Sequence, residues 1–256
     1  APFTLTTDAG GAVSTTVAAN AVAGSYQVTV SARGVVTPVV FSLTNQRITT
    51  TIVLTSAPNA SVYGERVTFT ATVSSDLHDA SAVKAAGGYD GPTGVVTFTT
   101  ASGDLGAVTL DADRVATLTT SSLAVGSHVI TATYGGDNNY LVSVSAPVTQ
   151  TVNKATATVN LGSLSHTYNG TPKPAIATTD PVSLTVDLTY NGVVTAPTNV
   201  GIYTVVGTVD DLNYTGVNTD TLTIGKASTA TALASSPNPS AFGQSVAFTA
   251  TVSMTP

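Results

Sequence analysis

The sequence predicts an all-β fold, in which small antiparallel β-sandwiches follow one another along the chain as an elongated array. Three observations lead to this prediction: a composition suited to strands, apolar residues that alternate with polar ones, and phrases that recur. Only 9% of the 256 residues are charged, and Glu occurs once, at Glu65. Helices are usually built from Glu, Lys and Leu, whereas the Thr and Val that dominate this chain suit strands.

The longest recurring phrase occurs twice, at an offset of 179 residues. Val53–Ser74 and Ala232–Ser253 are identical at 13 of 22 positions, including the run FTATVS. In the first copy, Val67, Phe69 and Ala71 alternate with threonines. A period of two describes a strand with one buried face and one solvated face. The repeat therefore indicates two copies of the beginning of one β module.

A second phrase occurs three times and marks one strand in each of three modules. In every copy a Gly is followed two residues later by a ring and then by alternating apolar residues, which is typical of the penultimate strand of a module. The copies are AGSYQVTV with Tyr26, VGSHVITA with His128, and VGIYTVVG with Tyr203.

Three basic residues mark the joints between modules. Arg47, Lys154 and Lys226 lie in the phrases NQRITTTI, VNKATATV and IGKASTAT, and their spacings of 107 and 72 residues together equal the repeat offset. We therefore expect four segments. These are the C-terminal part of a sandwich (1–46), a complete sandwich (47–153), a complete smaller β-rich module (154–225) and the N-terminal part of another sandwich (226–256).

No spacer rich in Gly, Ser or Pro separates these segments, so successive modules are expected to stack with limited freedom. Residues 1–46 and 226–256 contain too few strands to close a sandwich. Each is therefore expected to expose an apolar face or an unpaired edge.

The long module contains about seven short strands separated by turn residues, the pattern of an antiparallel sandwich. Alternating and β-branched runs place them at Thr49–Thr55, Arg66–Ser74, Gly94–Thr100, Ala107–Leu110, Val115–Thr119, Ser127–Tyr134 and Pro147–Val152. The turn phrases ASGD, DADR and YGGDNN predict hairpins after the third, fourth and sixth strands. The expected core consists of Val67, Phe69, Ala71, Val96, Phe98, Leu110, Leu118, Ile130 and Ala132.

The shorter module shows the same strand signals with fewer strands. The expected strands are Ala157–Asn160, Ser183–Leu188, Gly201–Thr208 and Thr219–Ile224, with turns at YNGTPKP and YNGV.

Blocks of the long module occur in the order typical of a known repeat. They are TSAPNASVYGERVTFTATVSS, PTGVVTFTT and LGAVTLDADRVATLTTSSLAVGSHVITATYGGDNNYLVSVSAPVTQTVNK, and with them the module resembles the bacterial Ig-like group 3 repeat over nearly its whole length. Residues 226–256 resemble the start of another such repeat. The stretch SLSHTYNGTPKPAIATTDPVSLTVDLTYNGVVTAPTNVGIYTVVGTVDDLNYTG, within 155–226, is similar to the MBG-type repeat, which is related to YDG repeats. TTDAGGAVSTTVAANAVAGSYQVTVSARGVVTPVVFSLTNQ is more loosely similar to the C-terminal half of a further bacterial Ig-like domain.

These resemblances imply a modular bacterial protein that is secreted or held at the cell surface, often as an adhesin or a stalk. They provide no catalytic residues to assign to this chain. The expected location is therefore extracellular or at the bacterial cell surface.

Composition narrows the partners and cofactors. The net charge of −6 and the singly scattered Lys and Arg argue against binding to nucleic acid or an anionic membrane surface. The absence of Cys excludes disulfides, thiolate metal sites and a Cys nucleophile. No apolar run approaches the ~18 residues that a membrane helix needs. We expect no cofactor and no metal, and the expected partners are the neighbouring repeats of the same chain and a possible protein or glycan ligand.

One loop is a candidate ligand-binding site. The stretch SDLHDASAVKAAGGYDGPTG, 75–94, is longer than is usual in group 3 repeats, and long loops on a rigid scaffold often carry binding residues. A tolerated insertion at a loop tip is the alternative explanation. The candidate residues in this loop are Asp76, His78, Asp79, Tyr89 and Asp90.

The patterns around the other polar residues indicate structural roles. His128 takes the place of Tyr26 and Tyr203, so a ring that fills a structural position explains it. The phrases DNNY (137–140) and DLNY (211–214) recur before the last strand of two modules, which predicts a turn with a Tyr packed beneath it. The close pairs Asp111/Asp113 and Asp210/Asp211 lack the pattern of a calcium loop.

The leading functional hypothesis is a non-catalytic, semi-rigid stalk or spacer in an adhesin-like array. The alternative is a carbohydrate-binding or host-ligand-binding module of an adhesin or secreted hydrolase, with Tyr89 as the best candidate for an exposed aromatic contact. An enzyme is not expected, because neither a Ser–His–Asp set nor a nucleophile elbow occurs.

Overall fold

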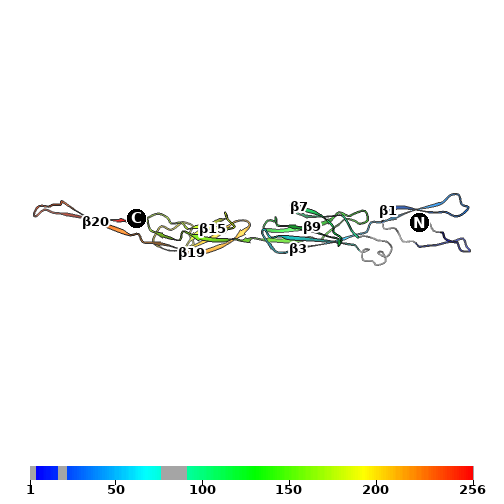
Figure 1. Cartoon of the computed structure of the whole chain (residues 1–256), viewed down its shortest axis with the longest axis horizontal. Helices are drawn as coiled ribbons and strands as arrows, with labels where there is room; N and C mark the ends of the chain where they lie inside the picture. The colour runs from blue at the N-terminus through cyan, green and yellow to red at the C-terminus, as the bar shows by residue number, and fades with distance from the viewer. Residues whose placement is uncertain (1–3, 17–21, 76–90, 256) are drawn as a thin grey trace. The chain divides into compact units, whose positions relative to one another are not determined.

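A computed structural model describes residues 4–16, 22–75 and 91–255 (Figure 1). Every regular element in these ranges is a β-strand. The chain divides into two units, Ala1–Val152 and Asn153–Pro256. The all-β fold class predicted from composition and alternation is confirmed.

Two sheets form a β-sandwich in the first unit. One sheet has the order β3 (Thr51–Ala57), β5 (Val67–Ser74), β8 (Val115–Thr120). The other has the order β4 (Ser61–Val62), β11 (Val148–Asn153), β9 (Gly126–Tyr134), β6 (Val95–Thr100), β7 (Gly103–Thr109), with β10 (Ser143–Val144) paired to β9.

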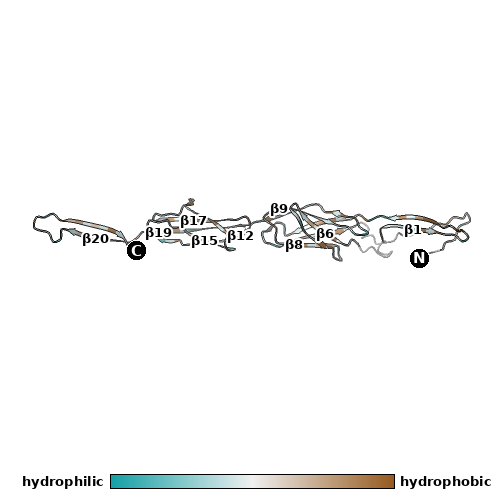
Figure 2. Ribbon diagram, turned by 90° about the horizontal axis from the view of Figure 1, so that it is seen from above, coloured by the Kyte–Doolittle hydropathy of each residue, from teal (hydrophilic) through white to brown (hydrophobic). Residues whose placement is uncertain are grey.

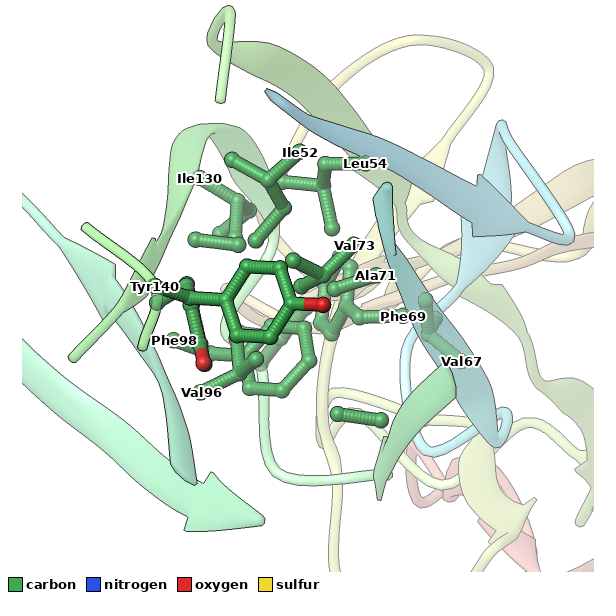
Figure 3. Packing of buried hydrophobic residues seen from close by; sticks show 14 of the residues in the cluster. Ile52, Leu54, Val67, Phe69, Ala71, Val73, Val96, Phe98, Ile130 and Tyr140 are labelled. Carbon is green, nitrogen blue, oxygen red and sulfur yellow. The ribbon is translucent and has the colours of Figure 1, made fainter. Parts of the chain in front are cut away.

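The core of the sandwich consists of the inward residues of both sheets. Ile52, Phe69 and Val73 come from one sheet, and Val96 and Phe98 from the other, and all are buried. Figure 3 shows these side chains gathered around the ring of Tyr140. Seven of the nine expected core residues are buried, whereas Leu110 and Leu118 are only partly buried and pack against the cluster.

The polar contacts of β11 explain why Pro-Asn recurs in the repeat. The side-chain amide of Asn59 donates to the Thr149 carbonyl oxygen at 2.7 Å, and its oxygen accepts the Thr151 N–H at 3.1 Å. Asn59 therefore pairs with the β11 backbone as a neighbouring strand would. Gln150 between these two residues is fully buried and donates to Ser61 Oγ at 3.1 Å.

The expected hairpin at DADR is wrong. Strand β7 before this turn pairs with β6, and β8 after it pairs with β5, so the turn carries the chain from one sheet to the other. The Asp111 carboxylate accepts the N–H groups of Asp113 and Val115, each at 2.9 Å. The turn can therefore be predicted from the sequence, but the strand with which each neighbouring strand pairs cannot.

In the second unit, residues up to 225 form a smaller β fold. Four strands have the order β14 (Ser165–Thr167), β19 (Val217–Gly225), β17 (Gly201–Asp210), β16 (Thr185–Tyr190). Strand β13 (Thr158–Gly162) pairs with β15 (Ile176–Asp180), and β12 (Ala155–Thr156) pairs with β18 (Tyr214–Thr215). Val205, Leu222 and Ile224 are buried in one cluster, and Ala157 and Val159 in another.

Two hairpins make up the rest of the described strands. Strand β1 (Gly24–Val30) pairs with β2 (Val39–Asn45), and β20 (Thr229–Ser236) pairs with β21 (Ala247–Met254), each pair forming a two-stranded sheet. Hydrophobic stretches lie along both hairpins in Figure 2. Their large apolar side chains are exposed, as expected for segments with too few strands to close a sandwich.

The recurring ring makes the same contact in two modules. His128 Nε2 lies 2.8 Å from the carbonyl oxygen of Ala124, four residues earlier. Tyr203 donates its hydroxyl to the carbonyl oxygen of Asn199, also four residues earlier, at 2.9 Å. A carbonyl oxygen only accepts, so Nε2 of His128 carries the proton. The structural role expected for this ring is confirmed.

This equivalence predicts that His128→Tyr leaves the free energy of unfolding of the first unit unchanged, whereas His128→Phe lowers it. The Phe ring fills the same space but cannot donate, and a lost hydrogen bond costs about 0.5–1.5 kcal/mol. Urea unfolding of the two variants measures the difference. Equal losses in both variants would contradict the shared role of His128 and Tyr203.

Candidate functional site at the module joints

The two D-x-N-Y phrases fold into the same turn. Asp137 Oδ1 accepts the N–H groups of Asn139 and Tyr140, each at 2.8 Å. Asp211 Oδ1 accepts the N–H groups of Asn213 at 2.7 Å and Tyr214 at 3.0 Å. An Asp that accepts from the two backbone groups ahead of it fixes the turn locally.

In the first unit, this turn holds the strand that opens the sandwich. The Asn139 carbonyl oxygen accepts the Ile48 N–H at 2.8 Å, and the Ile48 carbonyl oxygen accepts the Leu141 N–H at 2.9 Å. Ile48 and Tyr140 thus form a parallel bridge, 92 residues apart in the chain. The chain at the joint is fastened before β3 begins at Thr51.

The same turn also contacts the hairpin before the joint. The side-chain oxygen of Asn139 accepts the Ala23 N–H at 2.9 Å, immediately before β1. The amide group of Asn45, at the end of β2, donates to the Val22 carbonyl oxygen at 3.0 Å. Asn139 therefore binds the segment before the joint with its side chain and the first strand after the joint with its carbonyl oxygen.

The second unit repeats the arrangement. The Asn213 carbonyl oxygen accepts the Ala155 N–H at 2.9 Å, and the Thr215 carbonyl oxygen accepts the Ala157 N–H at 2.8 Å. Ala155 and Tyr214 are parallel partners, as Ile48 and Tyr140 are. Because Ile48 follows Arg47 and Ala155 follows Lys154, both bridges begin one residue after the basic residue that marks the joint.

Lys154 adds a contact of its own. Its ammonium group donates to the Asp211 carbonyl oxygen at 2.7 Å. A cation bound to the first residue of the turn explains why a basic residue occupies this joint. Only this residue separates β11, which ends at Asn153, from β12, which begins at Ala155.

Glycine is required at two points of close approach. Gly136 has a φ of +76°, and a Cβ there would lie 2.9 Å from the Tyr140 carbonyl oxygen. At Gly216, a Cβ would collide with the Ala157 carbonyl oxygen. Both glycines let the opening strand or its turn come close to the backbone of the same module.

The Asp137 carboxylate is held in its charged form. Burial acts to raise its pKa, but the hydrogen bonds from Thr93, Asn139 and Tyr140 outweigh burial and lower the pKa below its usual value. The Thr93 N–H and hydroxyl donate to Oδ2 at 2.9 and 2.8 Å. Burial, followed by the nearby charge of Asp137, raises the pKa of Tyr134, whose hydroxyl donates to the Thr93 carbonyl oxygen at 2.6 Å.

Two family models match the chain. The profile of the bacterial Ig-like domain (group 3) matches residues 54–153, and that of the MBG domain matches residues 157–228. The chain therefore carries a group 3 bacterial Ig-like domain followed by an MBG domain. The resemblance found in the sequence is confirmed for these two domains. Both matches begin after the residues that the D-x-N-Y turns bind, Ile48 and Ala155.

Several solved structures are similar at low identity. The fibronectin(III)-like modules of Clostridium thermocellum CbhA are 16% identical, over 68% of this chain and 94% of theirs, with a TM-score of 0.28. The titin domains z1z2, solved in complex with telethonin, are 16% identical, over 71% and 98%, with a TM-score of 0.35. A C-terminal fragment of intimin, solved with the intimin-binding domain of its translocated receptor, is 14% identical, over 72% and 65%, with a TM-score of 0.27. No curated protein sequence matches the chain significantly.

The residues proposed from sequence as a ligand site lie outside the described residues. Asp76, His78, Asp79, Tyr89 and Asp90 all fall within 76–90. The ligand site therefore stays a prediction. Where the chain is described again, Thr93 is bound by Asp137, so the end of this loop is anchored to the turn at the joint.

The remaining candidate groups make local contacts. His166 Nε2 lies 2.8 Å from the Ser163 carbonyl oxygen. In the described part of the chain, no three His, Cys, Asp or Glu residues gather as a metal ion requires. No helix within the described ranges is long and apolar enough to cross a membrane. The joint was not predicted as a functional site from the sequence, although the recurring D-x-N-Y phrases and the basic residues at the joints indicate it.

Asp137→Asn is expected to destabilise the Ig-like domain by about 1–2 kcal/mol. The carboxylate accepts four hydrogen bonds with its two oxygens, whereas an amide has one accepting oxygen and an NH2 group that only donates. The folded pKa is lowered, so this stabilisation is present above the unfolded Asp pKa of about 3.9 and is lost as the pH falls through the folded value.

Urea unfolding at pH 7 and at lower pH measures both effects. The difference between wild type and Asp137→Asn should shrink on acidification. Asp211→Asn is the matched control, because Asp211 Oδ1 accepts two N–H groups, and it should cost less. A difference for Asp137→Asn that does not change with pH would contradict the role of its charge.

Proposed function

We propose that this chain is a semi-rigid spacer in a bacterial protein that is secreted or displayed at the cell surface. Ig-like and MBG domains are typical of extracellular and surface proteins and are typically non-catalytic. The proposed role is mechanical: to hold other parts of an adhesin-like protein at a distance. Its proposed partners are the neighbouring repeats of the same chain.

The observation that carries this proposal is the joint at Lys154. One residue separates the last strand of the Ig-like domain from the first strand of the MBG domain. That residue and its successor are bound to the D-x-N-Y turn through the Lys154 ammonium group and the Ala155 N–H. A connection without free residues restricts the bending that a longer linker would permit.

The composition suits this role. The chain has no Cys and Met occurs once, so few side chains are susceptible to oxidation outside the cell. The cores of its two domains consist of aliphatic and aromatic side chains from short strands.

Distance measurements between the two domains test the spacer. We expect a narrow distance distribution between spin labels at Thr109→Cys on β7 and Thr185→Cys on β16, both exposed positions in a chain with no other Cys. Pulsed electron paramagnetic resonance gives this distribution. As a control, five Gly and Ser residues inserted between Asn153 and Lys154 should broaden it. A wild-type distribution as broad as that of the insertion would contradict the proposal.

A glycan array distinguishes the spacer from the alternative, a binding module. Specific binding that Tyr89→Ala abolishes would favour the binding module, whereas the spacer requires none.

Lys154→Met is a further variant for the distance measurement, because it removes the contact of the ammonium group while keeping the length of the joint.

A further inference from the structure

The first and last segments of the MBG domain run in the same direction and are hydrogen-bonded to each other. Strand β12 pairs in parallel with β18, and β14 pairs in parallel with β19. Strands β12 to β14 are the first three of this domain, and β18 and β19 are its last two. The segment 155–168 is therefore the parallel partner of the segment 213–225.

Backbone hydrogen bonds connect these two segments at both ends. At the joint, two N–H groups of the first segment donate to the last segment, as described above. At the far end, the Thr223 N–H donates to the Leu164 carbonyl oxygen at 2.8 Å. The Tyr168 N–H donates to the Gly225 carbonyl oxygen at 2.9 Å, so the contact extends to the last residue of β19.

Between the two ends, a side chain continues the contact. Strand β13 pairs with β15, but the side-chain amide of Asn218 in β19 donates to the Val159 carbonyl oxygen in β13 at 2.8 Å. In these five hydrogen bonds, the partners are separated by 57 to 59 residues in the chain. The bonds therefore follow one another in the same order along both segments.

Apolar side chains of both segments share the buried clusters of the domain. Leu164 of the first segment packs against the cluster that contains Leu222 and Ile224 of the last segment. Tyr214 of the last segment packs against the cluster that contains Val159 of the first. Sliding one segment past the other would therefore break hydrogen bonds and expose apolar surface in the same step.

Tension along the chain enters the domain at opposite ends of this parallel pair. The first segment begins at Ala155, next to Lys154, and the last segment ends at Gly225, next to Lys226. Because the segments are parallel, tension pulls them in opposite directions along the same line. The hydrogen bonds between them are then loaded together, in shear, rather than one after another.

We propose that the MBG domain is a load-bearing element, in which the segments 155–168 and 213–225 form a shear clamp that resists tension along the chain. This role goes beyond that of the spacer, which requires only resistance to bending. Resistance to tension is a kinetic property, because forced unfolding depends on the rate of unfolding.

Pulling the same protein in two directions tests the shear clamp. Because the chain has no Cys, DNA handles can be attached at introduced cysteines in the full chain. One variant carries Asn153→Cys and Lys226→Cys, and the other carries Asn153→Cys and Leu212→Cys, all at exposed positions. The first pair of handles loads the clamp in shear, whereas the second opens its bonds one after another from the joint.

Optical tweezers measure the unfolding force of both variants at one pulling speed. The force should be at least about twofold larger for the first pair of handles, because several bonds must break together. Equal forces in the two directions would overturn the proposal.

Two substitutions separate the clamp from general stability. Asn218→Ala removes the hydrogen bond to Val159 within the clamp. Thr179→Val is the matched control, because it removes a side-chain hydrogen bond from the Leu184 N–H, outside the clamp. Urea unfolding should show a lower free energy of unfolding for both variants. Only Asn218→Ala should lower the unfolding force between handles at positions 153 and 226, and an equal reduction by Thr179→Val would overturn the proposal.

Failure of the clamp can be distinguished from failure of the spacer. Equal forces in both directions, with a narrow distance distribution between the spin labels, would contradict the clamp and leave the spacer. A broad distance distribution, with a larger force in the shear direction, would contradict the spacer and support the clamp.

Discussion

Each of the two domains depends on one polar constraint: an aspartate carboxylate fixes a turn whose carbonyl oxygens bind the strand that opens the domain. Asp137 and Asp211 satisfy the N–H groups ahead of them, so the carbonyls of Asn139 and Asn213 are free to point at Ile48 and Ala155. Without such an arrangement, the backbone N–H and C=O groups of the first residues after a joint would lack hydrogen-bond partners. A buried backbone group without a partner lowers the free energy of unfolding.

The proposed spacer requires a stable interior in each domain and a fixed entry of the chain into each domain. Packing of alternating Val, Phe and Ile side chains stabilises the interior of each domain, but it does not determine how the chain enters the domain. Hydrogen bonds to the opening strand do so, and they bind Ile48 and Ala155, the residues that follow Arg47 and Lys154. A chain with no Cys thus fastens its domain ends by backbone pairing and short polar side chains.

Much of this architecture could be predicted from the sequence, and the reason is local. Alternation places Val67, Phe69 and Ala71 in the core, and the recurring D-x-N-Y phrase predicts a turn above a buried Tyr140. The partner of that turn could not be predicted, because it depends on a parallel bridge to Ile48 across 92 residues. The path through DADR was mispredicted for a similar reason, since an Asp turn looks the same within a sheet and between two sheets.

Native-state hydrogen exchange at Ile48, Ala155 and Ala157 tests the central claim most directly. These N–H groups have carbonyl partners only if the D-x-N-Y turns hold the opening strands. We predict that they exchange as slowly as central residues such as Phe69 and Val205, through unfolding of the whole domain. Exchange that is orders of magnitude faster at these three positions, while the central strands stay protected, would contradict the account.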